Sequence, residues 1–326
     1  MTNMRLAWVD KTKGVGMLLV ILGHMRYPYS DVIAKFIFSF HMPLFFFLSG
    51  YLHKNDFGKN YFLRRVDALL VPYFIWSILI WVVNLNWGRQ YMGEFIDIPL
   101  GNGYGITWFL SCLFLADIAS AFVVRKFGKR AVPILVVGVC CASLGVVVGY
   151  CNAICVVARL NAVLLAIGFW IAGWLFQKYK LFESYNAHAK WAVPVMLSVG
   201  VMYLVNSKVD MRTGNLGNPF LAYPVALAWI MLLVFVVRRI GISMSFLNFI
   251  GCNSLLFMVI HWILPTIIIA VFGAFGLDIV SIGAVAKTGV RIFTLALLFA
   301  LVSVVQKNSL LSGRYRLFSE RQKSQS

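Results

Sequence analysis

The feature that most constrains this 326-residue chain is a series of apolar runs, each long enough to cross a lipid bilayer. Apolar residues make up 61% of the chain and charged residues 12%, whereas soluble domains are about half apolar and a quarter charged. We therefore expect an all-α, multi-pass membrane protein. A bilayer core about 30 Å thick needs roughly 20 apolar residues per helix, which predicts about ten spans. They are residues 12–27, 32–52, 67–86, 105–125, 131–149, 159–177, 190–206, 220–238, 246–272 and 283–306.

The net charge of +18 would suit a nucleic-acid partner, but the cations separate by side of the membrane. In the ten-span arrangement most of the loop Lys and Arg residues lie on one side. The few on the other side are Arg26, Lys35, Arg89, Arg159, Lys208 and Arg212. Short loops rich in Lys and Arg stay in the cytoplasm. The charge therefore predicts two cytoplasmic termini, and no nucleic acid is expected to bind.

No stretch between the spans is long enough to build a soluble core. We therefore expect one membrane domain, residues 1–310, followed by a basic cytoplasmic tail, residues 311–326. The six cysteines form no metal-binding pattern, and no metal or permanently bound cofactor is expected. Four of them lie in spans and are read as small buried apolar residues: Cys112, Cys140, Cys141 and Cys252. Cys151 and Cys155 share an outward loop, where they could pair.

Two histidines lie inside consecutive predicted spans. His24 is near the end of the first, and His41 opens the run His-Met-Pro-Leu-Phe-Phe-Phe-Leu-Ser-Gly-Tyr of the second. Helical rise places both rings at a similar depth. A titratable group at membrane depth is energetically expensive and by default marks a functional site. The alternative is that each is a packed core histidine with a backbone partner.

The first span also carries an acid and a base on the face of His24. Lys13 precedes His24 by eleven residues, so the two differ by about 20° around a helix. Asp10 lies within about 60° of both, and three residues from Lys13, close enough to interact. This stripe leads from a charged cytoplasmic end to the imidazole.

Other polar residues are weaker candidates. The adjacent Arg64 and Arg65 suit a phosphate-bearing ligand, because guanidinium binds phosphate bidentately, although they could simply mark topology. Ser49 precedes Gly50, where small residues permit close helix approach. His261 is a third histidine at membrane depth. The remaining candidates are Tyr73, Trp108, Asn253 and Ser254.

Together these residues resemble the membrane-bound acyltransferase family 3, which includes surface-polysaccharide O-acetyltransferases and fucose 4-O-acetylase-like proteins. The matching motifs are Asp10-x-x-Lys13-Gly14, the spacing of Lys13 to His24, His41-x-Pro43-x-Phe45-Phe46-x-x-Ser49-Gly50-Tyr51, Arg64-Arg65 with Pro72-Tyr73, Trp108-Phe109-Leu110, and Ser254 through His261. The resemblance implies an enzyme of about ten helices that transfers an acyl group from cytoplasmic acyl-CoA to a sugar hydroxyl of an envelope glycan. It also implies a location in the bacterial inner membrane and implicates His24 and Lys13 in activity. Many members have Arg in place of Lys13, and Lys lacks the bidentate fork.

The resemblance and the chemistry together assign roles. The predicted catalytic residues are His24, as general base, with His41, Asp10 and Lys13. His41 would orient the acceptor or stabilise the oxyanion. Predicted acyl-CoA and substrate contacts are Arg64, Arg65, Ser49, Tyr73, Trp108, Asn253, Ser254 and His261. Acetyl-CoA would be the donor, and a lipid-linked sugar or glycan the acceptor.

Several alternatives stay open at this point. A histidine could be transiently acylated and relay the group, and a partner could complete the transfer. A transporter or flippase of a lipid-linked sugar would also place titratable residues in its spans. A non-catalytic assembly protein would not depend on the histidines at all.

Overall fold

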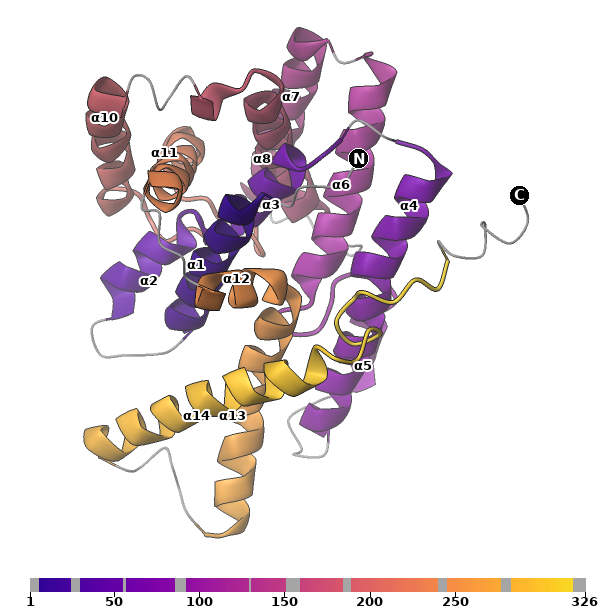
Figure 1. Ribbon diagram of the computed structural model, residues 1–326, viewed down its shortest axis with the longest axis vertical. Coiled ribbons are helices and arrows are strands. Elements are labelled where there is room, and N and C mark those ends of the chain that lie inside the picture. The colour runs from indigo at the N-terminus through magenta and orange to yellow at the C-terminus, as the bar shows by residue number, and fades with distance from the viewer. Residues whose placement is uncertain are drawn as a thin grey trace. The chain divides into compact units, whose positions relative to one another are not determined.

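The computed structural model describes residues 6–24, 30–54, 57–85, 92–128, 130–150, 159–183, 189–239, 245–276 and 283–318 (Figure 1). Within these ranges the structure is built from helices, and the one β-type pairing is an isolated bridge between Asp210 and Asn215. The helices are α1 (Ala7–His24), α2 (Ser30–Phe38), α3 (His41–Tyr51), α4 (Lys59–Arg65), α5 (Val71–Leu85), α6 (Trp108–Lys126), α7 (Ala131–Tyr150), α8 (Leu160–Lys178), α10 (Ala189–Val201), α11 (Pro219–Arg239), α12 (Ser245–Cys252), α13 (Ser254–Ala274) and α14 (Ala284–Val305).

The chain divides into two compact units. The first consists of Met1–Phe62 and Cys112–Cys252, and the second of Leu63–Ser111 and Asn253–Ser326. Helices α1, α2, α3, α7, α8, α10, α11, α12 and most of α6 therefore belong to the first unit, and α5, α13 and α14 belong to the second.

Among the described residues, 8 helices are long and apolar enough to cross a membrane, and they coincide with eight of the expected spans. The other two expected spans differ. Helix α1 carries Asp10, Lys11 and Lys13 in its first half and is not among the eight. In the 190–206 segment the apolar helical stretch covers only Ala192–Leu204. The all-helical, multi-span prediction is thus confirmed, and the count of ten is not.

Some predictions fall outside the described residues. These are the pairing of Cys151 with Cys155, the outward cations Arg26 and Arg89, and residues 319–326 of the expected tail. The four other cysteines carry free thiols: Cys112, Cys140, Cys141 and Cys252.

Two expected spans are each built from two consecutive helices: the 32–52 span keeps its predicted bounds, as Asp31–Tyr51, whereas the apolar helix of the 246–272 span begins only at Ser254. The 32–52 span is interrupted at Ser39 and Phe40, so that His41 begins α3. Pro43, in the first turn of α3, has no N–H to donate to the Ser39 carbonyl, and the Ser39 hydroxyl donates to the carbonyl of Phe36 in the last turn of α2. The 246–272 span is likewise interrupted at Asn253, between α12 and α13.

Glycines allow two helix pairs of the first unit to approach at backbone distance. A Cβ on Gly50 of α3 would collide with the carbonyl oxygen of Trp170 in α8, and one on Gly173 of α8 would collide with that of Phe47. In the same way, a Cβ on Gly14 of α1 would collide with the backbone of α12, and one on Gly251 of α12 would collide with the backbone of α1. Close contact between small residues is a main source of helix association in membranes. The prediction that Gly50 permits close approach is therefore confirmed.

Candidate functional site

Helices α1 and α3 run antiparallel, and this arrangement brings the two histidines together. At one end the Trp8 and Tyr51 rings lie 5.1 Å apart. At the other end, the rings of His24 and His41 lie 5.7 Å and 4.9 Å from the ring of Phe38, which belongs to α2. The predicted similar depth of the two histidines agrees with this geometry. Phe38 had no signal in the sequence that would have connected it to either of them.

Both imidazoles are oriented by the backbone of the preceding helical turn. Nδ1 of His24 lies 2.8 Å from the Val20 carbonyl oxygen, and Nδ1 of His41 lies 2.9 Å from that of Ile37. A carbonyl oxygen only accepts hydrogen bonds, so Nδ1 is the nitrogen that carries the proton in each neutral ring. Nε2 therefore carries the lone pair that a general base needs. His41 is buried, and His24 is half-buried, so the His24 ring is the more accessible.

A lysine adds a positive charge to this pair. The Lys208 ammonium lies 5.1 Å from the centroid of the Phe38 ring, within the range of a cation–π contact. Phe38 thus contacts His24, His41 and Lys208, and we call these four residues the histidine cluster. The sequence analysis gave Lys208 no role. The available signal was its position among the few cations of the predicted outer side.

Lys208 is held in a folded connection between α10 and α11, residues 206–218, which we call the 206–218 segment. The side chain of Asn206 closes it: its amide nitrogen donates to the Leu216 carbonyl at 3.1 Å. Its oxygen accepts from the backbone N–H groups of Ser207 and Asn218 at 2.9 and 2.7 Å. The hydroxyl of Tyr150, the last residue of α7, donates to the Gly217 carbonyl. These bonds fix the backbone of the segment that carries Lys208.

Asp10 and Lys13 lie at the opposite end of α1 from the histidine cluster. Lys13 precedes His24 by eleven residues, a rise of about 16 Å. Asp10 is buried, and its backbone carbonyl packs against Gly251 of α12. The structure therefore does not place these two predicted catalytic residues beside the imidazoles.

Ser49, at the far end of α3 from His41, belongs to a second polar cluster. Its hydroxyl donates to Oδ1 of Asp117 in α6 at 2.6 Å, and the indole N–H of Trp170 in α8 donates to the same oxygen. Asp117 is fully buried, and His53 lies with its ring 5.0 Å from that of Trp170. The sequence analysis did not single out Asp117, although an acid in the middle of a predicted span is a recognisable signal.

In the second unit, Arg64 is exposed and Arg65 half-buried at the end of α4. A π-helical turn, Val66–Leu70, follows, and such turns are frequent at functional sites. It contains the buried Asp67, whose carboxylate accepts from the backbone N–H of Phe318 at 3.2 Å.

Within the expected basic tail, the described residues 311–318 contact other parts of the second unit. Arg314 donates from its guanidinium to the side-chain oxygen of Asn253 at 2.8 Å, and Trp76 donates to the Leu311 carbonyl. Asn253 is buried where α13 begins, and Ser254 beside it is half-buried. Neither Arg314 nor Asp67 was predicted as a site residue.

Tyr73, Trp108 and His261 are buried in the second unit. The Tyr73 hydroxyl donates to the Ile98 carbonyl at 2.7 Å and accepts from the Gly103 N–H at 3.0 Å, which fixes the loop before α6. His261 repeats the arrangement of the other two histidines, with Nδ1 at 2.8 Å from the Phe257 carbonyl.

Comparison with known proteins places the chain in a family. The model of the acyltransferase domain matches residues 6–305. Two curated relatives, both called nodulation protein NolL, are similar over a short region. The protein from Mesorhizobium japonicum is 36% identical over 96 residues, which is 26% of each chain. The protein from Sinorhizobium fredii is 36% identical over 89 residues, 23% of this chain and 24% of the relative.

The chain thus aligns with only about a quarter of either curated relative. No solved structure matches it. The family match, in contrast, covers all the helices from α1 to α14. The protein belongs to the membrane-bound acyltransferase family 3, as its histidine motifs predicted.

Proposed function

We propose that the protein is an O-acyltransferase that moves an acyl group, acetyl in the simplest case, from acyl-CoA to a sugar hydroxyl of a cell-envelope polysaccharide or glycolipid. The family match supports acyl transfer. The observation that carries the proposal is the histidine cluster, in which two imidazoles of defined tautomer share Phe38 as a neighbour.

In the proposed reaction, Nε2 of His24 removes the proton from the sugar hydroxyl as its oxygen attacks the thioester carbonyl. A sugar hydroxyl is a weak nucleophile, and a base with a pKa near neutrality is suited to this step. The tetrahedral intermediate then expels the CoA thiolate, which takes up the proton from His24. The products are the sugar ester and free CoA.

His41 is proposed to orient the acceptor. With its proton on Nδ1 and shared with the Ile37 carbonyl, a neutral His41 presents an acceptor nitrogen at Nε2. That nitrogen can accept a hydrogen bond from a sugar hydroxyl but cannot donate one to an oxyanion. This geometry supports orientation of the acceptor over stabilisation of the oxyanion.

The remaining predicted residues are proposed to serve the donor. Lys13 and, in the second unit, Arg64 and Arg65 have the charge to bind CoA phosphates, and Asp10 lies one helical turn from Lys13 and can orient it. With this assignment the basic loops face the cytoplasm, where acyl-CoA is made, and the protein resides in the bacterial inner membrane.

The test is transfer of label from acetyl-CoA to the host glycolipid fraction, in membranes that contain the protein, with base-labile acetyl identified by mass spectrometry. His24→Ala is expected to lower turnover by about 10²–10⁴-fold. Leu22→Ala, a change at an exposed residue of the same helix, is the control at matched abundance. Turnover of His24→Ala equal to that of Leu22→Ala would exclude His24 as the base. Movement of the glycolipid without any covalent change would favour a flippase.

A further inference from the structure

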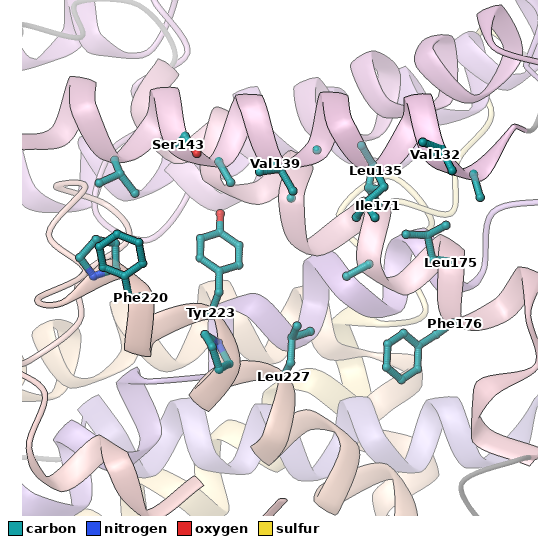
Figure 2. A pocket seen from close by; sticks show the side chains of 18 of the residues that line it. Val132, Leu135, Val139, Ser143, Ile171, Leu175, Phe176, Phe220, Tyr223 and Leu227 are labelled. Atoms are coloured by element: carbon teal, nitrogen blue, oxygen red, sulfur yellow. The ribbon is translucent and has the colours of Figure 1, made fainter. Parts of the chain in front are cut away.

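The first unit has a long apolar groove that the proposed reaction does not use (Figure 2). It measures about 940 Å³ and lies between α7 and α11, with α8 at its base. Figure 2 shows Val132, Leu135 and Val139 of α7 on one side and Phe220, Tyr223 and Leu227 of α11 on the other. The Tyr223 hydroxyl donates to the Leu165 carbonyl, so its polar atom is satisfied and its ring acts as an apolar wall.

The length of the groove indicates what it can hold. Its lining on α7 extends from Ala131 to Val147, a helical rise of about 24 Å, close to the thickness of the hydrocarbon core. The chain of a bilayer phospholipid reaches across only one leaflet, about half of that core. The groove is therefore long enough for a single hydrocarbon chain that exceeds the length of a phospholipid chain.

One end of the groove adjoins the 206–218 segment. Val147 and Phe220 line this end. Close to them, Tyr150 donates to the Gly217 carbonyl, and the backbone of Gly149 packs against that of Gly214.

The 206–218 segment carries two cations, Lys208 and Arg212, and one acid, Asp210. Positive residues at the opposite end of the groove are explained by the cytoplasmic excess of Lys and Arg. That explanation does not apply to Lys208 and Arg212, since they are among the few cations predicted to lie on the outer side. Their charge complements an anionic group at the end of the hydrocarbon chain.

We propose that the groove binds the hydrocarbon chain of a phosphate-linked glycolipid, with the phosphate against Lys208 and Arg212 and the sugar at His24 and His41. Lys208 connects the proposed phosphate position with the proposed sugar position, because its ammonium lies over Phe38, the neighbour of both histidines. This inference rests on the proposed function and narrows the acceptor to a lipid-anchored glycan.

The first experiment compares two acceptors in nanodiscs: the lipid-linked glycan fraction of the host, and the same glycan after mild acid release from its lipid. Val139→Trp fills the groove at a side chain that is 57% exposed. Val136→Trp is the matched control, on the same helix, 53% exposed and not part of the lining. The preference for the lipid-linked acceptor, as a ratio of kcat/KM values, is expected to fall about tenfold in Val139→Trp relative to the control. Equal preferences in the two variants would overturn the proposal.

A second experiment does not depend on activity. A photoreactive polyprenyl phosphate is expected to label the peptide that contains residues 131–147. Unlabelled polyprenyl phosphate should compete, and dioleoyl phosphatidylglycerol should not. Equal competition by the phospholipid would identify a site for bulk lipid, and crosslinks between two copies of the chain would identify an oligomer interface. Either result contradicts the proposal. Labelling of the groove without any acetyl transfer would instead show that the proposed reaction is wrong while the lipid site is right.

Discussion

The two ends of α3 both bury polar groups, but they differ in what those groups contact. At the Ser49 end, the hydroxyl of Ser49 and the indole of Trp170 donate to the Asp117 carboxylate, and glycines bring α3 and α8 to backbone contact. At the His41 end, His24 is bonded to the Val20 carbonyl of α1 and His41 to the Ile37 carbonyl of α2, and an exposed Lys208 completes the cluster. The first set of contacts joins three helices through one carboxylate, whereas in the second each imidazole is bonded through Nδ1 to a single backbone carbonyl.

Under the proposed reaction, the most deeply buried of the described carboxylates, that of Asp117, is not the reacting group. A buried hydrogen-bonded network fixes a fold, because leaving one member unsatisfied costs free energy. We therefore expect substitutions at the Ser49 end to lower stability and substitutions at the His41 end to lower activity.

The largest expected effect is at the glycine contacts of the Ser49 end. Gly50→Leu would drive a side chain into the Trp170 backbone, which cannot move aside as a flexible side chain could. Almost no monodisperse protein should be recovered after extraction into detergent. Gly273→Leu is the control, because a Cβ at Gly273 meets nothing within 4 Å. Normal recovery of Gly50→Leu would show that α3 and α8 are less closely packed.

The next effect is expected at the buried carboxylate. Asp117→Ala removes the acceptor of Ser49 and Trp170, and leaving both donors unsatisfied should lower the free energy of unfolding by about 3 kcal/mol. Asp117→Asn keeps an oxygen acceptor, so its free energy of unfolding should fall by a smaller amount. Thermal unfolding in detergent measures both, and an unchanged midpoint in Asp117→Ala would contradict the structural role.

A smaller effect is expected at the support of the histidine cluster. Asn206→Ala removes the three hydrogen bonds that close the 206–218 segment, which should displace Lys208. We expect kcat/KM to fall about tenfold, and the unfolding midpoint to fall as well because Asn206 is buried. Asn206→Asp retains the acceptor oxygen, and its kcat/KM should lie between those of the parent and the alanine variant. A loss of stability without a loss of activity would reverse this interpretation.

The smallest effect is expected at Lys208 itself. Lys208→Met keeps the length of the side chain but removes its charge, and KM for the acceptor should rise by about three- to tenfold. Lys208→Arg preserves the charge and should stay close to the parent. If the two variants had the same KM, the charge would have no part in acceptor binding.

The sequence predicted the helical class well, because apolar run length is a direct consequence of bilayer thickness. It predicted the number and the boundaries of the helices less well where polar residues interrupt an apolar run. Helix α1 carries three charged residues within its first half, and its burial depends on packing that a hydropathy pattern does not contain. The breaks at Ser39–Phe40 and at Asn253 had local signals, Pro43 and the pair Asn253-Ser254, but their positions depend on tertiary contacts.

The candidate site was predictable in its titratable residues and not in its neighbours. His24 and His41 stand out because histidine is rare at membrane depth, and helical rise placed them at one level. Phe38 looked like any other apolar residue. Arg314 could not be paired with Asn253, because a contact across 61 residues of chain has no local pattern.

The most direct test of this account measures turnover and thermal unfolding side by side for His24→Gln and Asp117→Asn. We predict that His24→Gln lowers kcat at least about 10²-fold with the unfolding midpoint of the parent. Asp117→Asn should unfold at a lower temperature while each folded molecule keeps the parental kcat. The opposite pattern, with a stability defect in His24→Gln and a loss of kcat in Asp117→Asn, would contradict the account. The reaction would then depend on the Ser49 end of α3 rather than on the His41 end.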